Sequence, residues 1–103
     1  MTRGQVWECA VGSRIARLLV VSNDEFNSDP ELAPWGLAIG PKAAVPSGLL
    51  IELTNADPLP GRVVYVPNVL RVDPSSFRTN LGFVGESTMT AVELALRDFL
   101  ALP

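Results

Sequence analysis

Short β-favouring runs separated by proline- and glycine-containing turns make up most of this 103-residue chain. Runs of strand length, rich in valine, isoleucine, leucine and aromatic residues, occur at residues 5–11, 17–22, 35–39, 49–53, 62–66, 69–72 and 81–84. Gly12-Ser13 marks a turn after the first run, and the polar segment 23–34 is expected to be a loop. This pattern predicts six or seven short strands that form a small, partly open barrel.

The C-terminal segment follows a different period. Met89, Val92, Leu96 and Phe99 recur at helical spacing, and Ser87 is placed where an N-cap is expected. No repeat or linker interrupts the chain, so residues 1–103 are expected to form one domain. The predicted fold class is therefore mostly β, with antiparallel strands closed by a C-terminal α-helix.

Hydrophobic residues make up 48% of the chain and the mean hydropathy is +0.27, which is high for so small a domain. Such a chain is expected to cover part of its apolar surface with a second copy, which predicts a homodimer. No apolar run reaches the ~20 residues that span a bilayer, and no secretory signal is recognisable. The single cysteine, Cys9, suits a reducing compartment and is expected in the core, so the predicted location is the cytoplasm.

The chain contains no histidine. This excludes Ser-His-Asp triads, paired-histidine nuclease chemistry and ordinary zinc sites, and it predicts no metal site and no cofactor. The net charge of −3 does not attract nucleic acid over the whole surface. However, every basic residue except Lys42 is arginine, whose planar fork binds two phosphate oxygens at once.

Three segments carry a resemblance to a known family. Arg3-Gly-Gln-Val-Trp7 resembles the first strand of the MazF/PemK toxins, which belong to the CcdB/MazF superfamily of toxin–antitoxin systems. Leu18-Leu-Val-Val-Ser-Asn-Asp24 resembles their second strand, and residues 89–100 resemble their closing helix. The order and spacing of these segments frame nearly the whole chain.

The resemblance implies an SH3-like barrel, a homodimer and a cognate, MazE-like antitoxin that occupies the active groove. It also implies a sequence-specific endoribonuclease that cleaves single-stranded RNA without metal, because the ribose 2′-hydroxyl attacks the adjacent phosphate. Such an enzyme supplies only proton transfer and charge stabilisation, which agrees with the missing histidine.

The catalytic positions differ from the family pattern. Nuclease members read Arg-Pro-x-x-Val-Val-Ser before and along the second strand, but counting back from Ser22 places Ala16 at the arginine position and Arg17 at the proline position. Arg17 is the first candidate for the catalytic arginine and Arg14 the second. The family also uses a Thr or Ser after the third strand, whereas residues 31–45 contain neither, so Lys42 and Ser47 are the candidates there.

Trp7, Arg62 and Arg71 are the candidates for RNA binding, since aromatic rings stack on bases and arginines bind the backbone. Arg62 and Arg71 are expected on adjacent strands that line one groove. The alternative function is a toxin-fold protein without nuclease activity, which binds an antitoxin or a protein target as CcdB binds DNA gyrase. The short turn before Arg14 resembles CcdB, but the chain lacks the C-terminal Trp-Gly-Ile of that branch.

Overall fold

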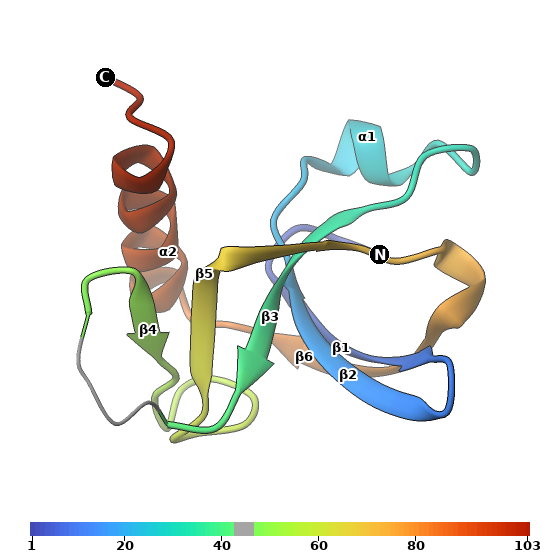
Figure 1. The fold of residues 1–103 in the computed structure, drawn as a ribbon, viewed down its shortest axis with the longest axis horizontal. Coiled ribbons are helices and arrows are strands. Elements are labelled where there is room, and N and C mark those ends of the chain that lie inside the picture. Colours follow the sequence, from blue (N-terminus) through green and yellow to red (C-terminus); the bar gives the residue numbers. More distant parts are fainter. Residues whose placement is uncertain (43–46) are drawn as a thin grey trace.

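The computed structural model describes residues 1–42 and 47–103 (Figure 1). Six strands and two α-helices follow one another along the chain, with a short 3-10 helix, η1 (Pro74–Ser76), before the last strand. The elements are β1 (Gln5–Val11), β2 (Arg14–Val20), α1 (Asp24–Asn27), β3 (Trp35–Gly40), β4 (Leu50–Glu52), β5 (Val63–Arg71), β6 (Phe77–Phe83) and α2 (Glu86–Phe99). The prediction of a mostly β chain that ends in a helix is confirmed.

All six strands belong to one antiparallel sheet with the order β4-β5-β3-β2-β1-β6. Gly12 and Ser13 join β1 to β2 in a two-residue turn, and Val11 pairs with Arg14 directly beyond it. Gly12 has a φ of 62°, a conformation that glycine adopts without the steric cost of a side chain. The predicted turn is therefore correct, but β2 begins at Arg14 and not at Arg17 as expected.

The predicted strands 62–66 and 69–72 are a single strand, β5. Its pairing with β3 shifts register between Leu37 and Ala38, opposite the part of β5 that contains Pro67. Proline cannot donate a ladder hydrogen bond, so it is placed at this irregularity. In Figure 1, β5 turns sharply near its middle, and its second half crosses toward β1 and β2. This bend curls the sheet into a partly open barrel, in which β4 and β6 remain the edge strands.

Two groups of buried side chains hold the fold together. The larger lies between the sheet and α2 and includes Val6, Leu19, Leu37, Val64 and Val92. The smaller lies on the other face of β2 and is centred on Cys9, Leu18 and Val20. Because side chains alternate along a strand, neighbouring residues of β2 serve opposite cores. The expectation that β2 is buried on both faces holds for its second half, Leu18 to Val20.

Two further expectations about helices are wrong. The segment 23–34 contains the short helix α1, which Asn23 caps by accepting a hydrogen bond from the Phe26 backbone at 2.8 Å. Helix α2 begins one residue after Gly85, so its N-cap is Gly85 and not Ser87. Neither described helix has the length and apolar character needed to cross a membrane.

Candidate functional site

Small residues form one face of the sheet where β2, β3 and β5 meet. Leu18 pairs with Ala38, and Ala38 pairs with Tyr65, so these three side chains lie on the same face. Ala16 and Gly40 lie two residues from Leu18 and Ala38, and therefore share that face. Ala16, Ala38 and Gly40 are half-buried, and we call them the small-residue surface. Their lack of bulky side chains leaves the backbone of β2 and β3 approachable.

A pocket of about 350 Å³ adjoins this surface where the start of β2 meets the end of β5. Its lining comprises Val11, Arg14, Ile15, Ala16, Leu70, Arg71 and Val72. Arg14 and Ala16 are two residues apart on β2, so the exposed arginine lies on the same face as the small-residue surface. The pocket thus combines two arginines with apolar walls, a combination that suits a phosphate attached to a nucleoside.

Arg17 lies on the opposite face of the sheet. It pairs across the strands with Glu8, and its Nε donates to the Glu8 carboxylate at 3.0 Å. Both side chains are only about a third exposed, at 35% for Arg17 and 27% for Glu8. The charge of Arg17 is therefore already balanced, and the side chain points away from Arg14. The structure does not bring the two candidate catalytic arginines together.

The end of β3 carries two further polar contacts. The Lys42 Nζ lies 3.4 Å from the Glu52 carboxylate, in a pair in which both side chains are more than half exposed. The Tyr65 hydroxyl donates a hydrogen bond to the Pro41 carbonyl. Tyr65 thus connects the centre of β5 to the segment that follows β3. The Lys42 ammonium extends away from β2, but an exposed pair of this kind exchanges readily with other partners.

Ser47 is exposed and its hydroxyl accepts a hydrogen bond from the Leu49 backbone at 3.2 Å, within the turn before β4. Trp7 packs edge-to-face on Phe77, with ring centroids 5.4 Å apart, and its indole donates to Gln5 at 3.0 Å. The positions of both side chains are therefore explained by contacts within the fold. The structure places neither of them on the small-residue surface.

Arg62 and Arg71 do not line one groove as expected. The two predicted strands are one, so Arg62 precedes β5 and Arg71 ends it. Arg62 is exposed in the turn near Glu52, whereas the Arg71 guanidinium lies 5.5 Å from the centroid of the Trp35 ring. Trp35 is 43% exposed, and this pair forms an arginine-backed aromatic surface that borders a separate hollow with Phe26, Leu96 and Leu100 on the α2 side of the sheet. The pairing of Trp35 with Arg71 across β3 and β5 brings the two together.

The Cys9 thiol is a buried, structural group. Burial raises the pKa of the Cys9 thiol to about 11, although the nearby Arg78 guanidinium acts to lower it. This thiol is therefore protonated and unreactive at neutral pH. Among residues 1–42 and 47–103, no cluster of three or more potential His, Cys, Asp or Glu ligands could hold a metal ion.

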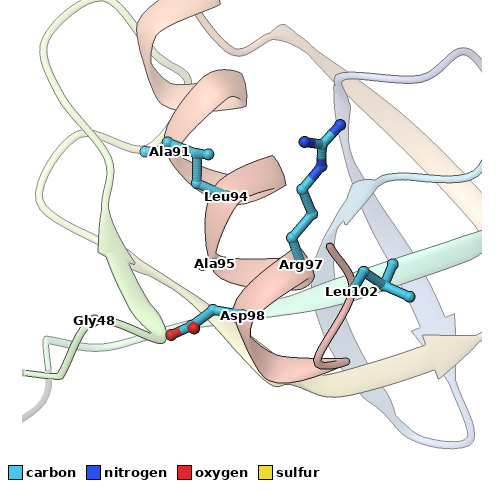
Figure 2. A pocket seen from close by; sticks show the side chains of 7 residues that line it. All are labelled: Gly48, Ala91, Leu94, Ala95, Arg97, Asp98 and Leu102. Carbon is cyan, nitrogen blue, oxygen red and sulfur yellow. The ribbon is translucent and has the colours of Figure 1, made fainter.

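A second hollow, of about 530 Å³, lies along the outer side of α2. Figure 2 shows Asp98 directed toward Gly48, while Arg97 points away from it. Leu94 and Leu102, which also line the hollow, are 61% and 56% exposed. The C-terminal end of α2 therefore presents an apolar surface that the described part of the chain does not cover.

No protein-family model matches the chain, and no curated protein matches it in sequence. Solved structures do match over its full length. A mycobacterial endoribonuclease in complex with its cognate antitoxin is 26% identical, with a TM-score of 0.88 and coverage of 100% of this chain and 97% of that one. The MazF component of a MazE–MazF complex from Deinococcus radiodurans is 17% identical, with a TM-score of 0.84 and the same coverage.

The Mycobacterium tuberculosis toxin MazF-mt6 is 14% identical, with a TM-score of 0.77 over 96% of this chain and 98% of that one. The two comparisons below 25% identity establish the fold alone. Together these matches confirm that the chain has a MazF-like toxin fold from end to end, as the resemblance in its sequence predicted.

Proposed function

We propose that this chain with a MazF-like fold is the toxin of a toxin–antitoxin system and cleaves single-stranded RNA at specific sequences without metal. Antitoxin-bound relatives support the assignment to a toxin, and the endoribonuclease relative supports the reaction. The cognate antitoxin would be a MazE-like protein. The substrate and the reducing environment that a free cysteine suits both point to the cytoplasm.

The position of Arg14 carries the proposal. Ala16 occupies the place where the family resemblance expects the catalytic arginine, and Arg14 lies two residues away on the same face of β2. Both residues line the same pocket. None of the ion pairs formed by the described residues uses Arg14, whereas Arg17 is bound to Glu8. Arg14 is therefore the better placed of the two to hold a phosphate, which reverses the order of preference taken from the sequence.

The reaction needs little from the protein. The ribose 2′-oxygen forms a bond to phosphorus as the bond from phosphorus to the 5′-oxygen breaks, which leaves a cyclic phosphate and a 5′-hydroxyl. The proton of the 2′-hydroxyl passes to water, and the leaving 5′-oxygen takes a proton from water. Arg14 would stabilise the negative charge that develops on the phosphate, which is the largest single contribution in many such sites.

Base recognition would come from the surfaces around the pocket. Arg71 lines the pocket and also contacts Trp35, whose exposed ring would be available, on the α2 side of the sheet, for a base further along the RNA strand. Arg62 and Lys42, near the opposite end of β5, would contact the backbone further along the strand. A single strand fits this arrangement because its bases can turn outward to meet the ring.

The proposed toxin would also form a homodimer. Leu94, Leu100 and Leu102 are each more than half exposed at the C-terminal end of α2, which supports the homodimer expected from composition. Sedimentation of the wild type should show a dimer. Leu94→Glu should shift it toward the monomer with its helix content unchanged.

The experiment for the nuclease itself is incubation of the purified protein with a long single-stranded RNA in EDTA. Discrete cleavage sites are the expected result. Intact RNA at high protein concentration would overturn the proposal and favour the alternative, a toxin-fold protein that acts by binding a protein target. The absence of Ser or Thr from residues 31–45 and the arginine that is out of register with the family pattern are the observations behind that alternative.

A further inference from the structure

The segment that follows β3 lacks a side-chain hydroxyl of its own. Residues 31–45 contain no serine or threonine. Ser47, the next hydroxyl along the chain, takes part in the turn before β4. A phosphate held by Arg14 at the small-residue surface would therefore need a neutral hydrogen-bond donor from another element.

Tyr65 brings a hydroxyl to this place from β5. Its backbone pairs with Ala38, and its hydroxyl donates to the carbonyl of Pro41, the first residue after β3. The ring passes directly over Gly40: a Cβ at Gly40 would lie 3.1 Å from the Cε2 of Tyr65. The glycine therefore gives the ring room to reach the end of β3.

The register places this hydroxyl within reach of the Arg14 pocket. The ladder between β2 and β3 ends at the pair of Arg17 with Ile39, next to Ala16 and Gly40, and Gly40 itself pairs with Val63 on β5. The Tyr65 backbone lies two residues further along β5, but its ring extends over Gly40 and its hydroxyl reaches Pro41. Adjacent strands are ~4.8 Å apart, so about 10 Å separate β2 from β5 across β3. An arginine from one side and a tyrosine from the other can meet at one phosphate across that width.

We propose that Tyr65 is a catalytic residue of the RNA-cleavage site and replaces the missing serine or threonine hydroxyl. It would donate a hydrogen bond to a non-bridging oxygen of the phosphate that Arg14 holds. The hydroxyl donates to the Pro41 carbonyl, and rotation about its C–O bond would redirect the same hydrogen bond to the substrate. No proton is transferred, because the bond only stabilises charge as the phosphate becomes five-coordinate. The inference rests on the proposed function.

Tyr65→Phe tests it, because phenylalanine keeps the ring over Gly40 and removes only the hydroxyl. We expect kcat to fall about 100-fold, as when one donor is removed from an anion site. KM and the melting temperature should change little. Ser47→Ala is the matched comparison: if Ser47 supplied the hydroxyl, its removal would cause the loss and Tyr65→Phe would not, which would overturn the inference.

A second measurement does not depend on a variant that folds well. Replacing a non-bridging phosphate oxygen with sulfur weakens the hydrogen bond it accepts, so one phosphorothioate diastereomer should slow the wild type. The same replacement should have little effect on Tyr65→Phe. Equal cleavage by the wild type and Tyr65→Phe, with equal sulfur effects, would overturn the role of Tyr65 and leave the nuclease proposal standing. Intact RNA with the wild type would overturn both.

Discussion

The Asp57 carboxylate accepts a hydrogen bond from the Thr88 hydroxyl at 2.6 Å, although 31 residues separate the two in the chain. The same carboxylate accepts from the Gly85 backbone at 2.6 Å and from both the backbone and the hydroxyl of Thr54. Gly85, the N-cap of α2, has no side chain to cap the helix. Asp57 therefore anchors the start of α2 to a distant turn, and its negative charge also suits the positive end of the helix dipole.

Asp57→Asn should destabilise the protein by about 3 kcal/mol, because the amide keeps only one acceptor oxygen, loses the charge, and places an NH2 donor where Asp57 accepted hydrogen bonds. Denaturant unfolding monitored by circular dichroism would measure this change. Asp73→Asn is the matched control, since Asp73 also accepts from a backbone N–H, that of Ser75, but is exposed. Its effect should be much smaller, and comparable losses in the two variants would contradict the anchoring role of Asp57.

Asp57 should also make stability depend on pH in the acid range. Burial acts to raise the pKa of its carboxyl, but the hydrogen bonds from Thr88, Thr54 and Gly85 outweigh burial and hold it below its ordinary value of 3.8. A group whose pKa is lower in the folded state stabilises the fold above its unfolded pKa and loses that contribution as pH falls through its folded pKa. The difference in unfolding free energy between wild type and Asp57→Asn should therefore be constant near neutrality and shrink at acid pH. A difference independent of pH would show that the charge is not involved.

Gly36→Ala should destabilise the barrel. A Cβ at Gly36 would lie 2.7 Å from the Cδ1 of Leu18 and 3.2 Å from its Cβ, and Leu18 is 1% exposed and has no room to retreat. Overpacking of this kind costs about 1–3 kcal/mol. Gly48→Ala is the matched control, because no atom lies within 4 Å of the added methyl group. Thermal unfolding of both variants would test the contrast, and equal melting temperatures would refute it.

The sequence predicts correctly the elements that are determined by residues close together in the chain. The two-residue turn at Gly12-Ser13 and the apolar period of α2 are properties of neighbouring residues, and both are correct. The N-cap was predicted wrongly at Ser87, because α2 begins after Gly85, whose backbone is held by Asp57 from about 30 residues earlier in the chain. Similarly, β5 looked like two strands because Pro67 breaks the pattern at a bulge that only pairing with β3 defines.

The candidate site could not be predicted in full either, because it depends on contacts between residues far apart in the chain. Choosing between Arg14 and Arg17 required knowing which face of β2 each occupies, and the turn at Gly12 sets that register. The pairing of Arg17 with Glu8 and the contact between Tyr65 and Pro41 join residues from different strands. Residue types at fixed spacing identified the arginines as candidates, but only the sheet shows which of them is free.

Glu52→Gln should strengthen RNA binding. Glu52 holds the Lys42 ammonium in an exposed pair, and such a pair contributes at most about 1 kcal/mol. Freeing the lysine and removing a negative charge should lower KM about two- to fivefold, with kcat unchanged. Glu31→Gln changes the net charge equally in the loop before β3 and serves as the control. An equal decrease in KM for both variants would indicate a general charge effect and not the release of Lys42.

Arg14→Ala and Arg17→Ala should have opposite consequences. Arg14 is exposed in the pocket beside Ala16, so its removal should lower kcat/KM for RNA cleavage about 100-fold with little change in melting temperature. Removing Arg17 leaves the half-buried Glu8 carboxylate without its partner, so that variant should unfold at a lower temperature while it retains more activity than Arg14→Ala. Arg78→Ala removes the same charge from β6 and controls for loss of general attraction to RNA. If Arg17→Ala abolished cleavage and Arg14→Ala did not, the phosphate would bind on the other face of the sheet, and the site would have to be placed there.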